Sequence, residues 1–244
     1  MSVAILTYHS LDETGSVISV SPQVFAAQMQ SLADARIRVV PLRDVPRHVE
    51  SREHVVAITF DDGFRNFREH AAPVLARHHF RATVFLVTAH CGGDNGWPTQ
   101  PSGVSRQPLL DWTDIKALHA AGFSFGAHSH THPFLTRQTL PAAESEMVES
   151  KRAIEHALSE IVDTFAYPYG DCNAQIRELA QRHFRLACGV GLGYAGRESD
   201  LMELDRLDMY YWRNQTGLSN LFAKSTRAYV GVRASLRTAR RLLS

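Results

Sequence analysis

The sequence predicts an α/β fold, a closed or nearly closed barrel of seven or eight β/α units. Short apolar, β-branched runs alternate with segments of helical pattern, which is typical of βαβ units and a largely parallel sheet. The length of 244 residues suits one such barrel. Residues that can carry chemistry recur directly after the apolar runs, and in a barrel those strand ends converge on one face.

Eight short runs are predicted as strands, most of them because they are apolar and rich in β-branched or aromatic residues. In chain order they cover residues 3–8, 37–40, 55–58, 82–87, 123–127, 163–167, 186–190 and 204–209. The first and third are continuous apolar runs, a pattern that indicates buried strands.

Helices are predicted between these strands, at residues 22–35, 64–79, 112–121, 141–161 and 173–183. Ser21 is the expected N-cap of the first, with Pro22 in its first turn. Pro73 is expected to bend the second helix, and Gly122 to end the third. Residues 91–111 are rich in Gly, Pro, Ser and Gln, which predicts a long surface loop of a kind that is often functional.

Composition excludes several kinds of partner and site. The chain is 44% hydrophobic and 21% charged, as is usual for a soluble globular protein, and its net charge of +1 gives no reason to expect nucleic acid. Its three cysteines form no disulfide framework and lack metal-type spacing. Neither a signal-peptide pattern nor an apolar run near the roughly 18 residues of a membrane span is visible. We therefore expect a cytoplasmic protein.

The last part of the chain differs from the rest. We expect residues 1–213 to form the barrel domain and residues 214–244 to form a C-terminal basic amphipathic helical extension. The cations of this extension are Lys224, Arg227, Arg233, Arg237, Arg240 and Arg241. Such a helix either packs on the barrel or makes a weak peripheral contact with an anionic membrane surface. We favour packing, because charged stripes are usually solvated faces.

Two adjacent carboxylates, Asp61 and Asp62, follow the strand predicted at residues 55–58, and Gly63 lets the chain turn away from them. Two like charges side by side are costly unless a cation lies nearby, so the pair indicates a metal ion or a strong cation. Asp-Gly is also a common turn signal, and a plain turn is the alternative interpretation of this segment taken alone.

Thirteen histidines are many for a chain of this size. His128 and His132 follow the strand predicted at residues 123–127, and on a helical turn their spacing would place both rings on one face. Two imidazoles and one carboxylate would make a three-ligand metal site with positions open for water and substrate. His130, between them, would point elsewhere. Non-haem iron oxygenases share this ligand set, but the Asp pair and the barrel pattern make them the weaker alternative.

Three segments together resemble the motifs of the polysaccharide deacetylases, the NodB-homology domain or carbohydrate esterase family 4. They are Thr59–Gly63, His128–His132 and, in its Pro-Tyr core, Phe165–Gly170. The resemblance covers about residues 3–210. It implies a distorted (β/α)7–8 barrel with the NodB-like deacetylase fold, and metal-dependent removal of N-acetyl groups from N-acetylhexosamine units of a polysaccharide or glycan precursor.

Carried over by position, the resemblance implies a role for each matching residue. Asp61 would be the general base for the attacking water. The metal ligands would be Asp62, His128 and His132. They would hold one divalent ion. Zinc is the expected ion, and cobalt, nickel, manganese and iron are alternatives. Tyr169, after Pro168, would offer its backbone N–H to the developing oxyanion.

Two parts of the family pattern are missing. No Arg stands just upstream of Pro168 to steady the base, and no Leu-x-His near the C-terminus supplies a general acid. In a closed barrel the first strand neighbours the last, so His9 is placed to substitute for that acid. Ile5–His9 also resembles the opening of a branch of the family that acts on poly-N-acetylglucosamine-type exopolysaccharides. We hypothesise that His9 is the general acid; a strand-end histidine bonded to the backbone is the alternative.

Arg206 is the candidate for the missing arginine. It lies near the end of the last predicted strand, and beside Asp61 it would hold that carboxylate ionised and oriented. An ordinary surface arginine paired with Asp205 or Asp208 is the alternative.

Candidate sugar-stacking aromatics are Trp97, Trp112, Tyr210, Tyr211 and Trp212, although most aromatic side chains belong to the core. The leading hypothesis is a metal-dependent N-deacetylase with a carbohydrate substrate. Two alternatives stay open: a deacylase of another small amide, and a catalytically silent carbohydrate-binding domain, which the two missing motifs motivate. The intact base and metal ligands argue against the silent domain.

Overall fold

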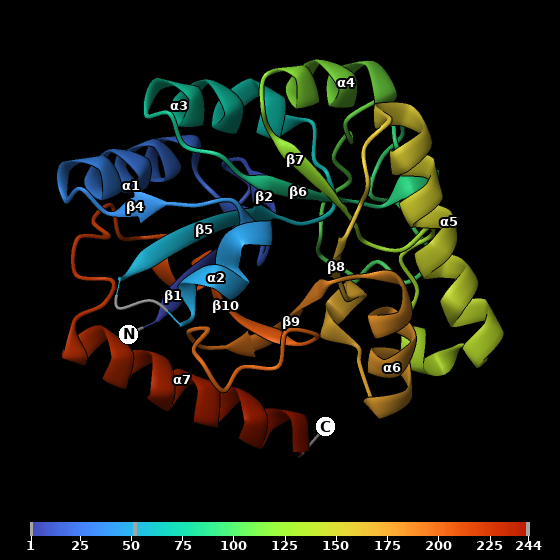
Figure 1. The fold of residues 1–244 in the computed structure, drawn as a ribbon. Coiled ribbons are helices and arrows are strands. Elements are labelled where there is room, and N and C mark those ends of the chain that lie inside the picture. The colour runs from blue at the N-terminus through green and yellow to red at the C-terminus, as the bar shows by residue number, and fades with distance from the viewer. Residues whose placement is uncertain (1, 51–52, 243–244) are drawn as a thin grey trace.

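The computed structural model describes residues 2–50 and 53–242, which form a parallel barrel surrounded by helices (Figure 1). One sheet has the strand order β1, β10, β9, β8, β7, β6, β5, β4, and β1 also pairs with β5. This extra pairing closes a ring of seven strands and confirms the predicted barrel. The strands of the ring are β1 (Val3–Tyr8), β5 (Val55–Phe60), β6 (Thr83–Leu86), β7 (Ser124–Ala127), β8 (Thr164–Ala166), β9 (Leu186–Leu192) and β10 (Leu204–Asp208).

In the described residues, three short strands lie outside the ring. β4 (Arg38–Val39) pairs in parallel with the first two residues of β5, on the edge of β5 opposite β1. β2 (Ser10–Leu11) and β3 (Ser19–Val20) pair with each other in a small second sheet. The loop between β2 and β3 therefore starts directly after the end of β1 and returns beside it.

Side-chain alternation along the ring strands decides which residues face the inside of the barrel. On β1, Val3 and Ile5 belong to one apolar cluster, and the same face continues through Thr7 to His9 just beyond the strand. β1 and β5 pair in register, so the equivalent face of β5 ends on Asp61. An apolar floor thus gives way to polar side chains at the carboxyl ends of the strands.

Helices cover the outside of the barrel (Figure 1). They are α1 (Pro22–Asp34), α2 (Val45–His48), α3 (Ala72–Arg77), α4 (Trp112–Ala120), α5 (Leu140–Leu158), α6 (Ala174–His183) and α7 (Lys224–Leu242). In α1 the buried side chains Phe25, Met29 and Leu32 recur at helical spacing and form the face that packs on the barrel. The expected cap is present, because the Ser21 hydroxyl accepts a hydrogen bond from the Val24 N–H at 3.2 Å.

The helix predicted at residues 64–79 is shorter than expected and changes type along its length. It begins as a π-helical turn, Phe67–Ala71, and continues as α3. Pro73 lies in the first turn of α3 and has no N–H to donate to the preceding turn. The expected bend at Pro73 therefore takes the form of a widened turn.

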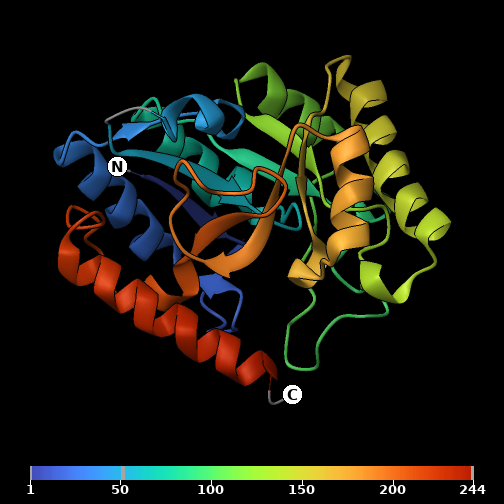
Figure 2. The ribbon, with the colours of Figure 1, turned by 60° about the horizontal axis from the view of Figure 1, so that its bottom comes forward.

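The C-terminal helix α7 packs on the outside of the barrel and runs toward its mouth (Figure 2). Val230 is 3% exposed, and the Tyr229 ring packs edge-on against Trp212 with centroids 5.7 Å apart. The side chains of Arg240 and Arg241 lie outside the described part of the structure. Within residues 2–50 and 53–242, every helix is too short or too polar to cross a membrane.

Candidate metal centre and catalytic cavity

Three buried side chains from two strand ends face a common point at the mouth of the barrel. Asp62 follows β5, and His128 and His132 follow β7. Asp62 Oδ1 lies 3.4 Å from Nε2 of each histidine, and the two Nε2 atoms are 3.3 Å apart. Ligands of a tetrahedral ion, about 2.0–2.1 Å from it, are separated from one another by roughly 3.3–3.4 Å. The three atoms therefore fit one face of such a coordination sphere and can hold one divalent metal ion.

Neighbouring groups prepare these side chains for a cation. His128 Nδ1 lies 2.7 Å from the carbonyl oxygen of Ala166, so Nδ1 carries the proton and Nε2 keeps its lone pair. Burial raises the pKa of Asp62, but the hydrogen bonds of the two histidines outweigh it and hold that pKa well below its ordinary value. Burial lowers the pKa of His132, which favours the neutral ring. An anionic carboxylate and neutral imidazoles are the forms that bind metal.

The Asp pair draws positive charge to this point. Burial by itself lowers the pKa of His128, yet the hydrogen bond to Asp62 and the charges of Asp61 and Asp62 raise it above its ordinary value. A cation beside Nε2 is therefore favoured electrostatically, whether it is a proton or a metal ion.

The loop after β7 reaches its geometry with left-handed backbone, so the helical turn expected from the histidine spacing was wrong. Ser129 has φ 64° and His132 has φ 63°, and the Ser129 hydroxyl accepts a hydrogen bond from the His132 N–H at 3.0 Å. Asp62 is left-handed as well, with φ 70°. This region costs a non-glycine residue about 1–2 kcal/mol, and such strain clusters at functional sites.

The turn after β5 explains why a glycine follows the two aspartates. Gly63 has φ 75°, and a Cβ there would lie 2.8 Å from Cδ2 of Leu86. A turn is therefore present, but it directs two buried carboxylates into the barrel. His130 points away, as expected, with Nδ1 2.9 Å from the Thr88 hydroxyl.

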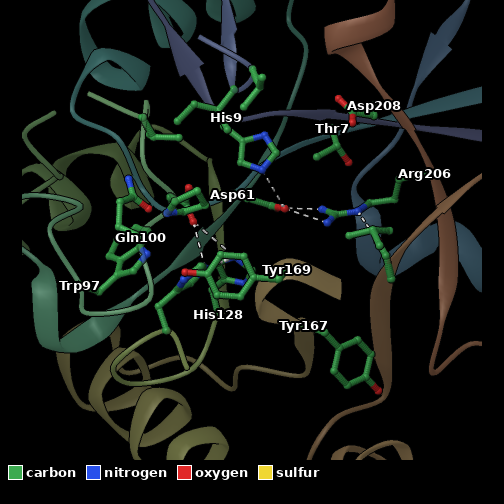
Figure 3. Close-up of a pocket in the computed structure, with 18 of the residues that line it drawn as sticks. Thr7, His9, Asp61, Trp97, Gln100, His128, Tyr167, Tyr169, Arg206 and Asp208 are labelled. Carbon is green, nitrogen blue, oxygen red and sulfur yellow. Dashed lines mark hydrogen bonds and ion pairs between the residues drawn. The ribbon is translucent and has the colours of Figure 1, made fainter. Parts of the chain in front are cut away.

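Asp61 forms a buried, bidentate ion pair with Arg206 (Figure 3). Arg206 Nη1 and Nη2 each lie 2.7 Å from a different carboxylate oxygen of Asp61, and the two side chains are 3% and 4% exposed. The Arg206 Nε–H donates to the carbonyl oxygen of Gly189 at 3.0 Å. Arg206 thus lies inside the barrel beside Asp61, and not on the surface with Asp205 or Asp208.

This ion pair sets the protonation state of Asp61. Burial raises the pKa of the carboxyl, but the charge of Arg206 and then that of His128 outweigh burial and hold the pKa below its ordinary value. The carboxylate is therefore ionised at neutral pH and can accept a proton.

In the view of Figure 3, His9 lies above the Asp61 carboxylate and His128 lies below it. Because β1 and β5 pair in register, the residue after β1 stands beside the residue after β5. His9 Nε2 is 3.8 Å from Asp61 Oδ2, beyond hydrogen-bond distance, and the His9 side chain is 26% exposed. The ring is thus near the carboxylate and accessible from the cavity.

The third segment forms a tight turn after β8, at Pro168–Gly170. Tyr169 has φ 58°, and its ring lies against His132 with centroids 4.5 Å apart. Its hydroxyl lies 3.0 Å from the carbonyl oxygen of Thr99 and 2.9 Å from the Thr99 hydroxyl. Tyr169 lines the cavity, whereas Pro168 is buried outside its lining.

The long loop predicted at residues 91–111 covers the metal centre. The Trp97 ring packs on His132 with centroids 4.3 Å apart, and the Thr99 hydroxyl donates to the His132 carbonyl oxygen at 2.8 Å. Trp97 is the sugar-stacking candidate that lines the cavity. The candidates that do not line it are Trp112, Tyr210, Tyr211 and Trp212.

One cavity of about 150 Å³ at the mouth of the barrel is lined by the three candidate metal ligands and by His9, Asp61, Trp97, Tyr169 and Arg206. Among the lining residues that the sequence reasoning did not place at the site are Thr7, Val17, Gln100, Val104, Asp208 and Arg237. Alternation would have found two of them, because Thr7 lies two residues before His9 and Asp208 two residues after Arg206. No sequence pattern places Arg237, a residue of α7, at the same cavity.

Residues 48–184 match the family model described as polysaccharide deacetylase. This span is more than half of the chain, and it contains the Asp pair, both histidines of the candidate metal site, and Tyr169. The chain belongs to the polysaccharide deacetylase family. His9 and Arg206 lie outside the matching span.

Individual relatives extend this similarity over most of the chain. The Bacillus subtilis protein YxkH is 24% identical over 208 residues, which cover 83% of this chain and 70% of that protein. The poly-beta-1,6-N-acetyl-D-glucosamine N-deacetylase of Staphylococcus epidermidis is 27% identical over 167 residues, 64% of this chain but only 55% of that enzyme. The Streptococcus pyogenes deacetylase PplD, solved with acetate, has the same fold, with a TM-score of 0.74, 24% identity, and coverage of 85% of this chain and 92% of that one.

Proposed function

We propose that this protein is a metal-dependent hydrolase that removes N-acetyl groups from N-acetylhexosamine units of a polysaccharide or glycan precursor. One observation carries the proposal: a three-donor metal site and an ionised carboxylate lie side by side in one cavity. Asp62 contributes to the first, and its neighbour Asp61 is the second. Amide hydrolysis needs a Lewis acid and a general base together, and this cavity can provide both.

The residues of the cavity divide the chemistry among them. A divalent ion bound at the site would polarise the amide carbonyl and lower the pKa of the attacking water. Asp61 accepts the proton of that water, and Arg206 holds the carboxylate ionised and fixes its orientation. The backbone N–H of Tyr169 stabilises the negative charge that develops on the carbonyl oxygen.

His9 is the proposed general acid. It donates a proton to the leaving nitrogen, so that the C–N bond breaks to give acetate and a free amino sugar. Its position supports this role, because the ring is exposed to the cavity and separated from the Asp61 carboxylate by 3.8 Å. A histidine bonded to the backbone, the alternative for this residue, would not need a place in the cavity.

Zinc is the proposed metal. Two histidines and one aspartate at tetrahedral spacing suit zinc, and the remaining positions would be open to water and substrate. Cobalt, nickel, manganese and iron compete for such nitrogen and oxygen donors. Metal analysis of the purified protein, with reconstitution by each ion, distinguishes them.

The proposed substrate class rests on the family and on its named relatives. The Staphylococcus epidermidis relative acts, by its name, on poly-beta-1,6-N-acetyl-D-glucosamine, and its match covers 64% of this chain. A polymer or precursor of N-acetylated amino sugars is therefore the class to test first. The intact base and metal ligands favour a hydrolase over a silent carbohydrate-binding domain.

The experiment is to measure acetate release from β-1,4- and β-1,6-linked N-acetylglucosamine oligomers by the metal-loaded protein. We expect acetate release, and we expect chelation to abolish it and added metal to restore it. Asp61→Asn is the control, because it keeps the shape of the side chain but removes its basicity. Metal-loaded protein that releases no acetate from any acetylated sugar would contradict the proposal. Release from small acyl amides alone would favour the alternative deacylase.

A further inference from the structure

We propose that Arg237 of the C-terminal helix, paired with Asp208, is a sugar-binding residue of this site. The inference rests on the proposed function and goes further, because it makes α7 part of the substrate-binding cavity. It also means that one cation of the basic extension binds substrate and does not merely face solvent.

The geometry of β10 places a second ion pair above the first. Arg206 and Asp208 are two residues apart on one strand, so their side chains share the face that points into the barrel, roughly 6–7 Å apart along the strand. Arg206 reaches inward to Asp61. Asp208, in register with Thr7 at the end of β1, stands one layer nearer the mouth of the cavity.

The two ion pairs differ in a way that suits different tasks. Arg206 and Asp61 are buried and joined by two bonds of 2.7 Å, which leaves the guanidinium little freedom. Arg237 Nη1 lies 3.5 Å from Asp208 Oδ2, and the two side chains are 27% and 33% exposed. This outer pair is loosely joined and keeps N–H donors and a carboxylate oxygen available to a ligand.

Both partners of the outer pair are held in place from outside the cavity. The Tyr210 N–H donates to Asp208 Oδ1 at 3.1 Å, which fixes the carboxylate and leaves Oδ2 toward Arg237. Arg237 Cζ lies 5.9 Å from the Tyr211 ring. The helix that carries it is anchored by the buried Val230. The position of Arg237 is thus set by packing before any ligand binds.

The chemistry of the outer pair favours neutral hydroxyl groups. A hydroxyl both donates and accepts, so it can meet the guanidinium and the carboxylate together. An anionic group would approach the Asp208 carboxylate, and its attraction to Arg237 would be offset. Several other lining residues are apolar or aromatic, Trp97, Val104 and the 62% exposed Val17 among them, and they suit the apolar face of a pyranose ring.

The test compares two arginines on α7 in the full-length, metal-loaded protein, with a neutral N-acetylglucosamine oligomer as substrate. Arg237→Ala is expected to raise KM about tenfold with kcat within about twofold, because hydrogen bonds from a charged group are lost while the metal and base stay in place. Arg237→Lys should recover part of the loss, and Asp208→Asn should also raise KM. The matched control is Arg233→Ala: Arg233 lies over Tyr211 and Tyr229 and is outside the cavity lining, so KM should stay unchanged.

Three results would overturn the inference while the proposed function stands. The first is an unchanged KM in Arg237→Ala. The second is an equal rise in KM in Arg233→Ala, which would reflect the docking of α7 alone. The third is a rise in the KM of Arg237→Ala that is seen only with oligomers that carry a carboxylate. Wild-type protein that binds metal and releases no acetate would instead contradict the proposed function, and this inference with it.

Discussion

The two walls of the cavity come from different parts of the chain. The metal wall follows β5, β7 and β8, together with the long loop before α4, and consists of Asp62, Trp97, His128, His132 and Tyr169. The base wall comes from the first and last strands of the ring, and consists of Thr7, His9, Arg206 and Asp208. Asp61 lies between the two walls: it is hydrogen-bonded to Arg206 of the base wall, and the charge of His128 in the metal wall lowers its pKa.

The candidate metal site and the groups proposed to transfer protons thus have separate structural origins. The metal wall lies wholly within the span that matches the family model, and each of its ligands follows a strand that the sequence predicts. The base wall lies outside that span and exists because β1 pairs with β10. Changes in the metal wall should therefore remove the metal, whereas changes in the base wall should leave the metal bound and alter turnover.

The largest effect is expected from loss of a metal ligand. His132→Ala removes one of three donors, so bound metal should fall from one ion per chain to a small fraction and acetate release should fall by on the order of a thousandfold. Elemental analysis and an acetate assay measure the two. His130→Ala is the matched control, since His130 bonds Thr88 outside the site and should keep both metal and activity. Full metal occupancy in His132→Ala would remove His132 from the metal wall.

Arg206→Met is expected to have the next largest effect. It leaves Asp61 buried without its partner, so stability should fall by about 3–5 kcal/mol, measured by chemical denaturation of the metal-loaded protein. Arg206 lowers the pKa of Asp61, so its loss raises that pKa and activity on the acid side should disappear at a higher pH than in the wild type. Metal content should be unchanged. The double variant with Asp61→Asn should recover much of the stability, and failure to do so would show that Arg206 acts by packing alone.

His9→Gln tests the proposed acid at a smaller cost. The side chain is 26% exposed and 3.8 Å from its nearest carboxylate oxygen, so melting temperature and metal content should be unchanged. Turnover of an N-acetyl sugar should fall about a hundredfold, which is typical for loss of a general acid. An aryl acetate ester, whose leaving group needs no proton, should lose far less. Equal losses on the two substrates would argue that His9 positions the substrate or Asp61 instead.

The smallest effect is expected from Tyr169→Phe, which removes the hydroxyl contact with Thr99. The cost should be about 1 kcal/mol, measured as stability, with a rise of a few fold in KM because the loop over the metal wall is held less firmly. The kcat should be retained, since the backbone N–H proposed to bind the oxyanion is untouched. Tyr210→Phe, outside the cavity lining, is the control. A large loss of kcat would indicate that the hydroxyl itself takes part in the reaction.

Much of the fold followed from local pattern. The strands at residues 3–8 and 55–60 have almost the predicted bounds, because a buried parallel strand is marked by a nearly continuous apolar run. The bend at Pro73 was expected, but its π-helical form was not, since the pattern of apolar residues is blind to how a missing N–H is accommodated.

The sequence by itself determined which reactive side chains follow which strands. It placed two carboxylates after one strand and two histidines after another, and it showed the alternation of strands and helices. These features depend on residue type and spacing, which can be read from short segments of the chain. The same is true of Gly63, whose positive φ the chain turn requires.

Only the tertiary structure decided how these groups meet. The pairing of β1 with β10 brought Arg206 to Asp61, across 145 residues of chain, and the pairing of β1 with β5 brought His9 beside the same carboxylate. The left-handed backbone of His132 depends on packing that opposes local preference, and Arg237 reaches the cavity because α7 docks through Val230. In each case the deciding energy comes from contacts between segments far apart in the chain, which no local pattern contains.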